Sequence, residues 1–197
     1  MTYTIIGGLN GVGKSTVYSL LSDKEKEQLG RRINVDEIVA EMGPWQDTKL
    51  QTIAGKHAVK NIKDCLNSKQ NFHQETTLAG ISILNTVKTA KEKGFYICLW
   101  YMYVKDVEIA KDRVLSRVIK GGHGVSEALI DKRSKTSIET LKLLIPLCDE
   151  VRVYDNTKAF TAVARITNNE LKILDKTIPN DILSCLYQTY SETINAK

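Results

Sequence analysis

The sequence predicts an α/β protein with a doubly wound, mostly parallel sheet. Strand-like stretches alternate with amphipathic helical stretches along most of its 197 residues, which is the pattern of repeated strand–helix–strand units. In addition, residues 95–104 are uniformly apolar and rich in aromatic and β-branched side chains, as expected for a central parallel strand covered on both faces. Open sheets of this kind bind ligands at the carboxyl ends of their strands.

The first half of the chain contains three strand–helix units. They are a strand at 2–6 with a helix at 12–21, a strand at 32–35 with a helix to Met42, and a strand at 71–74 with a helix ending at Gly94. A further helix, at 47–68, lies between the second and third units. The helix at 47–68 is the clearest, because its apolar residues recur at spacings of three and four.

The second half begins with the central strand and adds a lid and a C-terminal extension. Two helices, 106–120 and 126–145, flank the glycine-rich stretch 121–124, so we expect a hinged helical lid at about 106–146. A strand at 150–154 follows, then a β-hairpin (159–166 and 170–174) and a helix, an addition covering 158–197 in which no chemistry is readable. The length suits a single domain, 1–197.

Composition favours an anionic small ligand. The formal net charge is +5 and the isoelectric point about 8.9, which suits nucleotides, while the absence of a Lys/Arg-rich tract argues against nucleic acid as the main partner. The longest apolar run is too short to span a membrane, so we expect neither a membrane nor a secretory segment. Four scattered cysteines without metal-ligand spacing predict reduced, buried thiols and a cytoplasmic location.

The stretch Gly8-Leu9-Asn10-Gly11-Val12-Gly13-Lys14-Ser15 satisfies the phosphate-binding P-loop, or Walker A, pattern G-x-x-x-x-G-K-[ST]. It lies between a predicted strand and a predicted helix, where backbone N–H groups from Gly8 to Thr16 can turn toward phosphates. Lys14 is expected to bridge the β- and γ-phosphates of ATP. Ser15 is expected to bind Mg²⁺.

Two carboxylates at strand ends are candidates for the acceptor side of the site. Asp36 follows the second strand and is placed to accept a proton from an attacking hydroxyl, and Glu75, after the third, could do the same. Asp36 also suits a helix N-cap, and Glu75 a surface position. The sequence leaves open which of the two reaches the metal, although Ser15 and Asp36 are our predicted ligands.

The lid carries arginines suited to a transferring phosphoryl group. Arg113 and Arg117 share one helix face, and Arg133 lies one turn into the next helix. We interpret Arg117 and Arg133 as charge stabilisers of a small-molecule kinase lid, and Arg113 as a solvated cation. His123, in the glycine stretch, is a substrate contact or a turn residue rather than a metal ligand, because no second His or Cys is spaced to help it.

An ordered set of motifs over residues 3 to 157 resembles the zeta-toxin-like P-loop kinases. Besides the P-loop, the set consists of Asn34-Val35-Asp36-Glu37-Ile38, Glu75-Thr76-Thr77-Leu78, Arg113-Val114-x-x-Arg117-Val118, Gly121-Gly122-His123 and Tyr154-Asp155-Asn156. Zeta toxins use ATP and Mg²⁺ to phosphorylate the 3′-hydroxyl of UDP-N-acetylglucosamine and are restrained by an antitoxin.

The resemblance implies roles for individual residues. Asp36 would be the general base, and Arg117 and Arg133 would contact phosphates. Asn156 would lie near the adenine. Glu75 would help to hold the substrate or the metal. Together with Glu75, we predict that Thr76, Thr77 and His123 bind the substrate.

The sequence also departs from the family pattern. Related chains often have Asn-Pro-Asp where this one has Asn34-Val35-Asp36, and His-Asp-Val-Pro where it has His123-Gly124-Val125-Ser126. We therefore expect an ATP- and Mg²⁺-dependent kinase acting on a small-molecule hydroxyl, with a nucleotide sugar as one candidate and an antitoxin as a candidate partner. The alternative is a P-loop ATPase or nucleotide switch that acts on a macromolecular partner.

Overall fold

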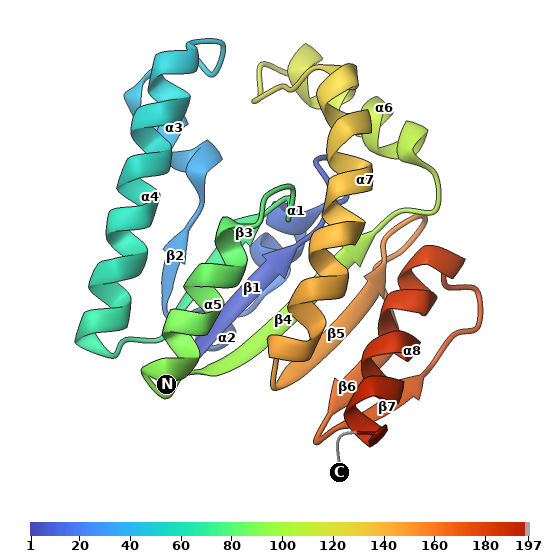
Figure 1. The fold of residues 1–197 in the computed structure, drawn as a ribbon. Helices are drawn as coiled ribbons and strands as arrows, with labels where there is room; N and C mark the ends of the chain where they lie inside the picture. Colours follow the sequence, from blue (N-terminus) through green and yellow to red (C-terminus); the bar gives the residue numbers. More distant parts are fainter. Residues whose placement is uncertain (196–197) are drawn as a thin grey trace.

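The computed structural model describes residues 1–195, and side chains through residue 189. Its centre is a seven-stranded sheet in the order β2-β3-β1-β4-β5-β6-β7, which places β4 in the middle as the apolar run predicts (Figure 1). The strands are β1 Thr2–Gly7, β2 Arg31–Ile33, β3 Phe72–Thr76, β4 Tyr96–Tyr103, β5 Glu150–Asp155, β6 Thr161–Thr167 and β7 Glu170–Ile173. Strands β1 to β5 are parallel, and β6 and β7 are antiparallel.

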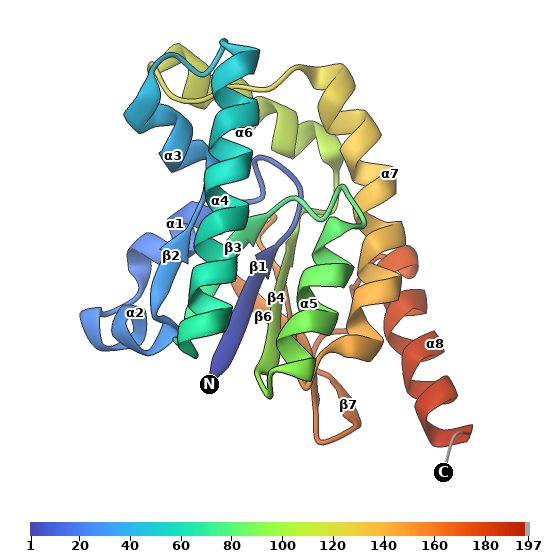
Figure 2. The same ribbon diagram turned by 60° about the vertical axis from the view of Figure 1, so that its left-hand side comes forward.

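Helices cover both faces of the sheet, which confirms the doubly wound prediction. In Figures 1 and 2, α4, α5, α7 and α8 lie on one face and α1 and α2 on the other. The helices are α1 Lys14–Leu20, α2 Asp23–Leu29, α3 Val35–Met42, α4 Thr48–Ser68, α5 Ser82–Glu92, α6 Val107–Ile119, α7 Glu127–Leu144, the 3₁₀ turn η1 Ile145–Leu147, and α8 Asn180–Asn195. Among them, no helix is long and apolar enough to cross a membrane.

Alternating side chains of β1 divide the core into two layers. Tyr3 and Ile5 are fully buried against α4, α5 and α7, whereas Ile6 faces a second cluster formed by the P-loop, α1 and α6. Because successive strand residues point to opposite faces, one strand of six residues contacts both helical layers. The loop after β1 therefore starts from a rigid base.

Most predicted elements are observed, with shifts at their ends. The helix after the P-loop begins at Lys14 rather than at 12, and the hairpin turns at Asn168 and Asn169, both with positive φ, as a two-residue antiparallel turn requires. The helix α2 was absent from our interpretation, although Ser22 and Glu25 form a complete capping box at its start.

Three local interpretations were wrong. Asp36 is not the N-cap of α3, because the side chain of Asn34 accepts the hydrogen bond from the Asp36 backbone N–H at 3.0 Å. Glu75 lies inside β3 and is buried, so it is not a surface carboxylate beyond the strand. Cys148 is only partly buried, unlike the other three cysteines, and all four are free.

His73, in β3, is completely buried and stacks on Tyr18, with ring centroids 4.9 Å apart. Burial and the nearby cation of Arg32 lower the pKa of His73 from 6.5 to about 4. Between pH 6.5 and pH 4, His73 is protonated in the unfolded chain but neutral in the folded chain. The free energy of unfolding therefore decreases as the pH falls through this range.

We expect the free energy of unfolding to decrease by about 3 kcal/mol through this residue between pH 7 and pH 4. Urea unfolding across this range would measure the decrease, and His73→Gln should remove most of it. A slope that is equally steep in His73→Gln would assign the acid sensitivity to other groups.

Candidate active site

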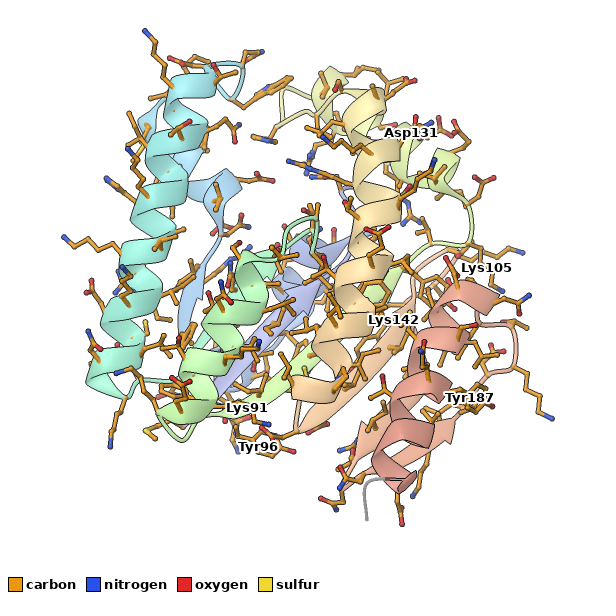
Figure 3. All side chains as sticks on the ribbon, viewed as in Figure 1. Lys91, Tyr96, Lys105, Asp131, Lys142 and Tyr187 are labelled. Carbon is orange, nitrogen blue, oxygen red and sulfur yellow. The ribbon has the colours of Figure 1, made fainter. Side chains whose placement is uncertain are left out.

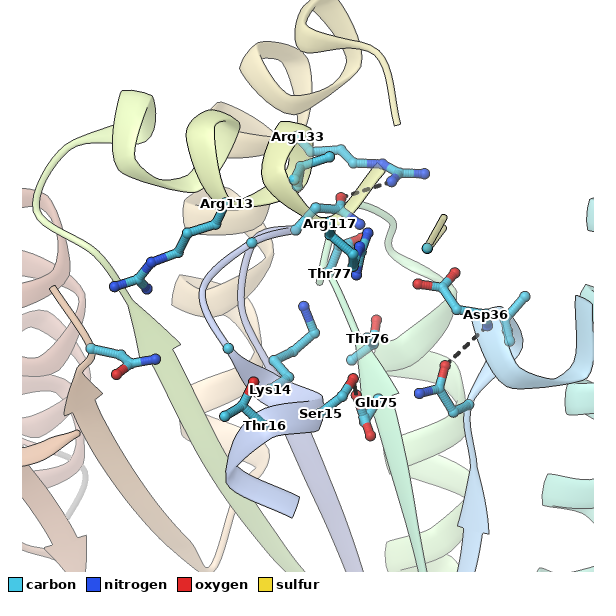
Figure 4. Close-up of a pocket in the computed structure, with 18 of the residues that line it drawn as sticks. Lys14, Ser15, Thr16, Asp36, Glu75, Thr76, Thr77, Arg113, Arg117 and Arg133 are labelled. Atoms are coloured by element: carbon cyan, nitrogen blue, oxygen red, sulfur yellow. Dashed lines mark hydrogen bonds between the residues drawn. The ribbon is translucent and has the colours of Figure 1, made fainter. Parts of the chain in front are cut away.

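A cleft of about 990 Å³ opens at the carboxyl ends of β1, β2 and β3 (Figure 4). The P-loop and α1 form its floor, α3 one wall and α6 with the start of α7 the other. Lys111 of α6 pairs with Asp131 of α7, which is labelled in Figure 3, at a distance of 2.8 Å, and this ion pair connects the two lid helices. The volume lies at the upper end of ordinary ligand pockets, so a nucleotide and a second molecule can fit together.

The backbone of the P-loop adopts conformations that require glycine. Gly11 has a φ of 81°, and a Cβ there would lie 2.2 Å from the carbonyl oxygen of Ala110 in α6. Gly13 has a φ of 93°, and a Cβ there would lie 2.3 Å from Nδ2 of Asn156. The loop is thus packed directly against the lid and against the end of β5, where side chains other than hydrogen would force it open.

Lys14, the first residue of α1, folds back onto the P-loop. Its Nζ donates to the carbonyl oxygens of Gly8 at 2.7 Å and Leu9 at 2.9 Å. Burial lowers the pKa of Lys14 to about 8, although the carboxylates of Glu75 and Asp36 favour its charged form. Because the Lys14 ammonium group is desolvated and its pKa is close to neutral pH, a bound phosphate would stabilise its charged form.

Ser15 and Glu75 meet at the floor of the cleft. The Ser15 hydroxyl donates to Oε2 of Glu75 at 2.7 Å, and Ser15 is exposed to the open cleft while Glu75 is buried. The other oxygen, Oε1, lies 2.5 Å from Nη2 of Arg32 in β2. Since β3 is the neighbour of β1, with Glu75 opposite Ile6, this carboxylate lies beside the P-loop in the sheet.

Asp36 faces the floor from the first turn of α3 (Figure 4). Its Oδ1 lies 3.4 Å from Nε2 of His123 in the loop between α6 and α7, and the side chain is 42% exposed. Burial lowers the pKa of His123, which the Asp36 carboxylate partly opposes. The structure therefore brings a carboxylate and an imidazole together from two walls of the cleft.

The lid arginines differ in their surroundings. The Nε and Nη2 atoms of Arg117 are buried without a hydrogen-bond partner among the described residues. Arg133 donates from Nη1 to Oδ1 of Asn10 in the P-loop at 2.8 Å, and burial lowers its pKa. Both side chains line the cleft, and an anion placed there would satisfy them.

Arg113 also lines the cleft, at its far end beside Asn156. It donates to the carbonyl oxygen of Thr157 at 3.1 Å, so it is not simply a solvated cation as we predicted. Asn156 donates from Nδ2 to the carbonyl oxygen of Val12 at 2.8 Å, which joins the end of β5 to the P-loop.

The structure gathers most of the predicted site residues in one place. The predicted site residues that line the cleft are Asn10, Gly11, Gly13, Lys14, Ser15, Thr16, Asp36, Glu75, Thr76, Thr77, Arg117, Arg133 and Asn156. Gly8 and Val12 belong to the loop without lining the cleft, and His123 reaches it through Asp36.

Sequence reasoning missed Arg32 and Asn34 at this site. Asn34 has the side chain of a helix N-cap two residues before Asp36, which was a readable signal. No signal in the sequence points to Arg32, because its contact with Glu75 depends on β2 lying next to β3.

The loop of His123 docks on the α3–α4 connection and roofs the cleft. The rings of Trp45 and His123 lie 5.4 Å apart, and a Cβ on Gly124 would lie 2.7 Å from the Trp45 ring and 2.6 Å from Val118. Gly124→Ala is therefore expected to lift the loop away from Trp45. Trp45 fluorescence, measured in a Trp100→Phe background, should shift to the red, and kcat should fall several-fold.

The matched control for Gly124→Ala is Gly55→Ala in α4, because a Cβ at Gly55 meets nothing within 4 Å. Gly55→Ala should leave both readouts unchanged. An unshifted emission spectrum in Gly124→Ala would mean that the loop does not rest on Trp45.

No protein-family model matches the chain. An uncharacterised protein of Haemophilus influenzae is 37% identical over 126 residues, which cover 64% of this chain and 87% of that protein. The match therefore includes nearly all of the relative.

Solved structures share the fold. A chain of the PezAT chromosomal toxin–antitoxin system of Streptococcus pneumoniae superimposes with a TM-score of 0.64 at 15% identity, over 99% of this chain and 86% of that one. A chain of the AvrRxo1-ORF1:ORF2 complex with ATP gives a TM-score of 0.69 at 14% identity, over 96% of this chain. Our chain spans 63% of that longer protein.

These comparisons show the family through the sequence relative and the fold through the solved structures. The chain belongs to the same family as the Haemophilus influenzae protein, and its fold is that of the zeta-toxin-like P-loop kinases.

Proposed function

We propose that the protein is an ATP- and Mg²⁺-dependent kinase that phosphorylates a hydroxyl group of a small molecule. The observation that carries this proposal is the position of Asp36 across the cleft from Lys14, Arg117 and Arg133 (Figure 4). A general base thus faces three cations that surround the place where a γ-phosphate would lie on the P-loop. An ATPase or nucleotide switch needs no such base for an alcohol.

In this proposal each side chain has a defined task. Asp36 accepts the proton of the acceptor hydroxyl, and His123 holds its carboxylate in place. Lys14, Arg117 and Arg133 offset the negative charge of the transferring group, and closure of the lid excludes water. Catalysis then depends mainly on positioning and electrostatics.

Ser15 and Glu75 fit a magnesium ion. Both offer hard oxygen donors, and the 2.7 Å between them is close to the spacing of neighbouring oxygens around Mg²⁺, about 2.9 Å in an octahedron. We therefore assign the metal to Ser15 and Glu75, and Asp36 to the acceptor. When bound, the metal would neutralise charge on the β- and γ-phosphates.

The acceptor side supports a polar, hydroxyl-rich substrate. Thr76 and Thr77 line both the main cleft and an adjoining 420 Å³ pocket between α4, α5 and α7. Arg133 also lines both spaces, which suits an acceptor that carries negative charge. We propose a nucleotide sugar, with UDP-N-acetylglucosamine as the first candidate.

The test is ATP turnover with mass spectrometry of the products, with and without a panel of nucleotide sugars and simple sugars. A product one phosphate heavier than its acceptor, absent without enzyme, would support the kinase. Steady ADP release with no phosphorylated product would instead favour the ATPase or switch.

A protein partner is a further part of the proposal. Two of the fold neighbours come from a toxin–antitoxin system and from a two-protein complex. If this chain is a toxin that an antitoxin inhibits, expressing it alone should arrest bacterial growth, and expressing Asp36→Asn should not. Normal growth with active enzyme would argue against a toxin.

A further inference from the structure

Arg32 lies beneath the floor of the cleft and is linked to α1 by two separate sets of contacts. Its Nη2 lies 2.5 Å from Oε1 of Glu75, and the other oxygen of Glu75 accepts from Ser15 at 2.7 Å. The Cζ of Arg32 lies 3.7 Å from the ring centre of Tyr18, which is three residues after Ser15 on α1. Arg32 therefore holds α1 twice, through the Tyr18 ring and through Glu75.

The ion pair between Arg32 and Glu75 is largely buried. The side chain of Arg32 is 17% exposed and that of Glu75 is 4% exposed. Removing two charges from water costs several kcal/mol, and such pairs often stabilise a fold less than apolar residues of the same size would. A role in orienting the carboxylate explains the arrangement better than a contribution to stability.

Glu37 is a second carboxylate partner of the same guanidinium nitrogen of Arg32. Its Oε1 lies 2.6 Å from Nη2 of Arg32, but its side chain is 52% exposed. Glu37 anchors Arg32 from the first turn of α3, next to Asp36. The guanidinium thus joins three elements that meet at the site, namely α1, β3 and α3.

We propose that Arg32 is a positioning residue for the divalent cation, and this inference rests on the proposed function. Arg32 fixes the rotamer of Glu75 and the position of α1, so that the Ser15 hydroxyl and the Glu75 carboxylate stand ready at the spacing that Mg²⁺ requires. Arg32 itself touches neither the metal nor the nucleotide. Without Arg32, the Glu75 carboxylate would turn toward Lys14, the other nearby cation, whose charged form it stabilises.

The test measures metal binding rather than turnover. Mg²⁺ is titrated into the protein saturated with ADP, followed by calorimetry, and ADP affinity is measured separately in EDTA. In Arg32→Met, the half-saturating Mg²⁺ concentration is expected to rise at least fivefold, while ADP affinity in EDTA changes less than twofold. Arg32→Lys keeps the charge but not the planar contact with Tyr18, so a smaller rise, about threefold, is expected.

Arg31 provides a matched control. It precedes Arg32 on the same strand, is exposed, and donates to Oδ1 of Asn61 at 2.8 Å, away from the cleft. Arg31→Met removes the same charge and should leave the Mg²⁺ titration unchanged. An equal rise in both variants would indicate general electrostatics and overturn the inference.

The outcomes separate this inference from the proposed function. If the wild-type protein with ADP shows no saturable Mg²⁺ binding, the proposed function fails first. If the wild-type protein binds Mg²⁺ and folded Arg32→Met binds it equally well, only the role of Arg32 fails. Should Arg32→Met not fold, Arg32→Lys decides, and wild-type Mg²⁺ binding in that variant would overturn the inference.

Discussion

Replacing Asp36 with asparagine is expected to lower kcat by about 10³-fold, within the range that general bases contribute. Asparagine keeps the shape of the side chain and the start of α3, where Asn34 and not Asp36 provides the cap. It cannot accept a proton from a hydroxyl group. Stability should therefore change little.

Product formation and ADP binding, measured together, check the Asp36 prediction. ADP affinity should stay within about twofold of wild type, because Asp36 faces the acceptor and not the P-loop. Glu41→Gln, an exposed carboxylate on the same helix, is the control and should retain full turnover. Turnover in Asp36→Asn within tenfold of wild type would remove Asp36 as the base and leave Glu75 as the remaining carboxylate.

Replacing Lys14 with methionine is expected to reduce kcat/KM by 10² to 10³-fold, roughly the effect of removing one preorganised donor at a developing charge. The variant loses the cation proposed to lie near the transferring phosphate and the two hydrogen bonds to the carbonyl oxygens of Gly8 and Leu9. Nucleotide affinity should therefore fall together with turnover. Lys24→Met, an exposed lysine on α2, should change neither.

The pH dependence of ADP binding gives a second test of the role of the Lys14 charge. With a pKa of about 8, the free protein loses this proton as the pH rises, whereas bound phosphate favours the charged form. Affinity in EDTA should therefore fall about tenfold between pH 7 and pH 9, since about one free molecule in ten stays protonated at pH 9. Lys14→Arg should bind more weakly but with a flatter profile. A profile in Lys14→Arg as steep as that of wild type would assign the titration elsewhere.

Local patterns predicted the fold well. The P-loop stands between β1 and α1, and the lid helices flank the glycine-rich stretch, because each of these features depends on residues that are close in sequence. The same applies to β4, whose continuous apolar stretch places it at the centre of the sheet.

The contacts across the site could not be predicted in the same way. Arg133 meets Asn10 across 123 positions and Asn156 meets Val12 across 144, so no local pattern records them. The end of the third strand is another example. The sequence predicts that it ends at residue 74, but β3 continues to Thr76, which lies opposite Gly7 of β1. Where a strand ends depends on the strand that it pairs with, and the local sequence does not record this. The roles of the gathered residues stay predictions.

The two edges of the sheet also bear on how the protein behaves at high concentration. One edge is β2, with three residues, and the other is β7, with four, and exposed Arg31 and Glu170 lie on them. Short, charged edge strands offer few free backbone groups to a strand from another molecule. The long, apolar strands β1 and β4 are enclosed between neighbours, so folded copies of this chain are expected to resist joining sheet to sheet.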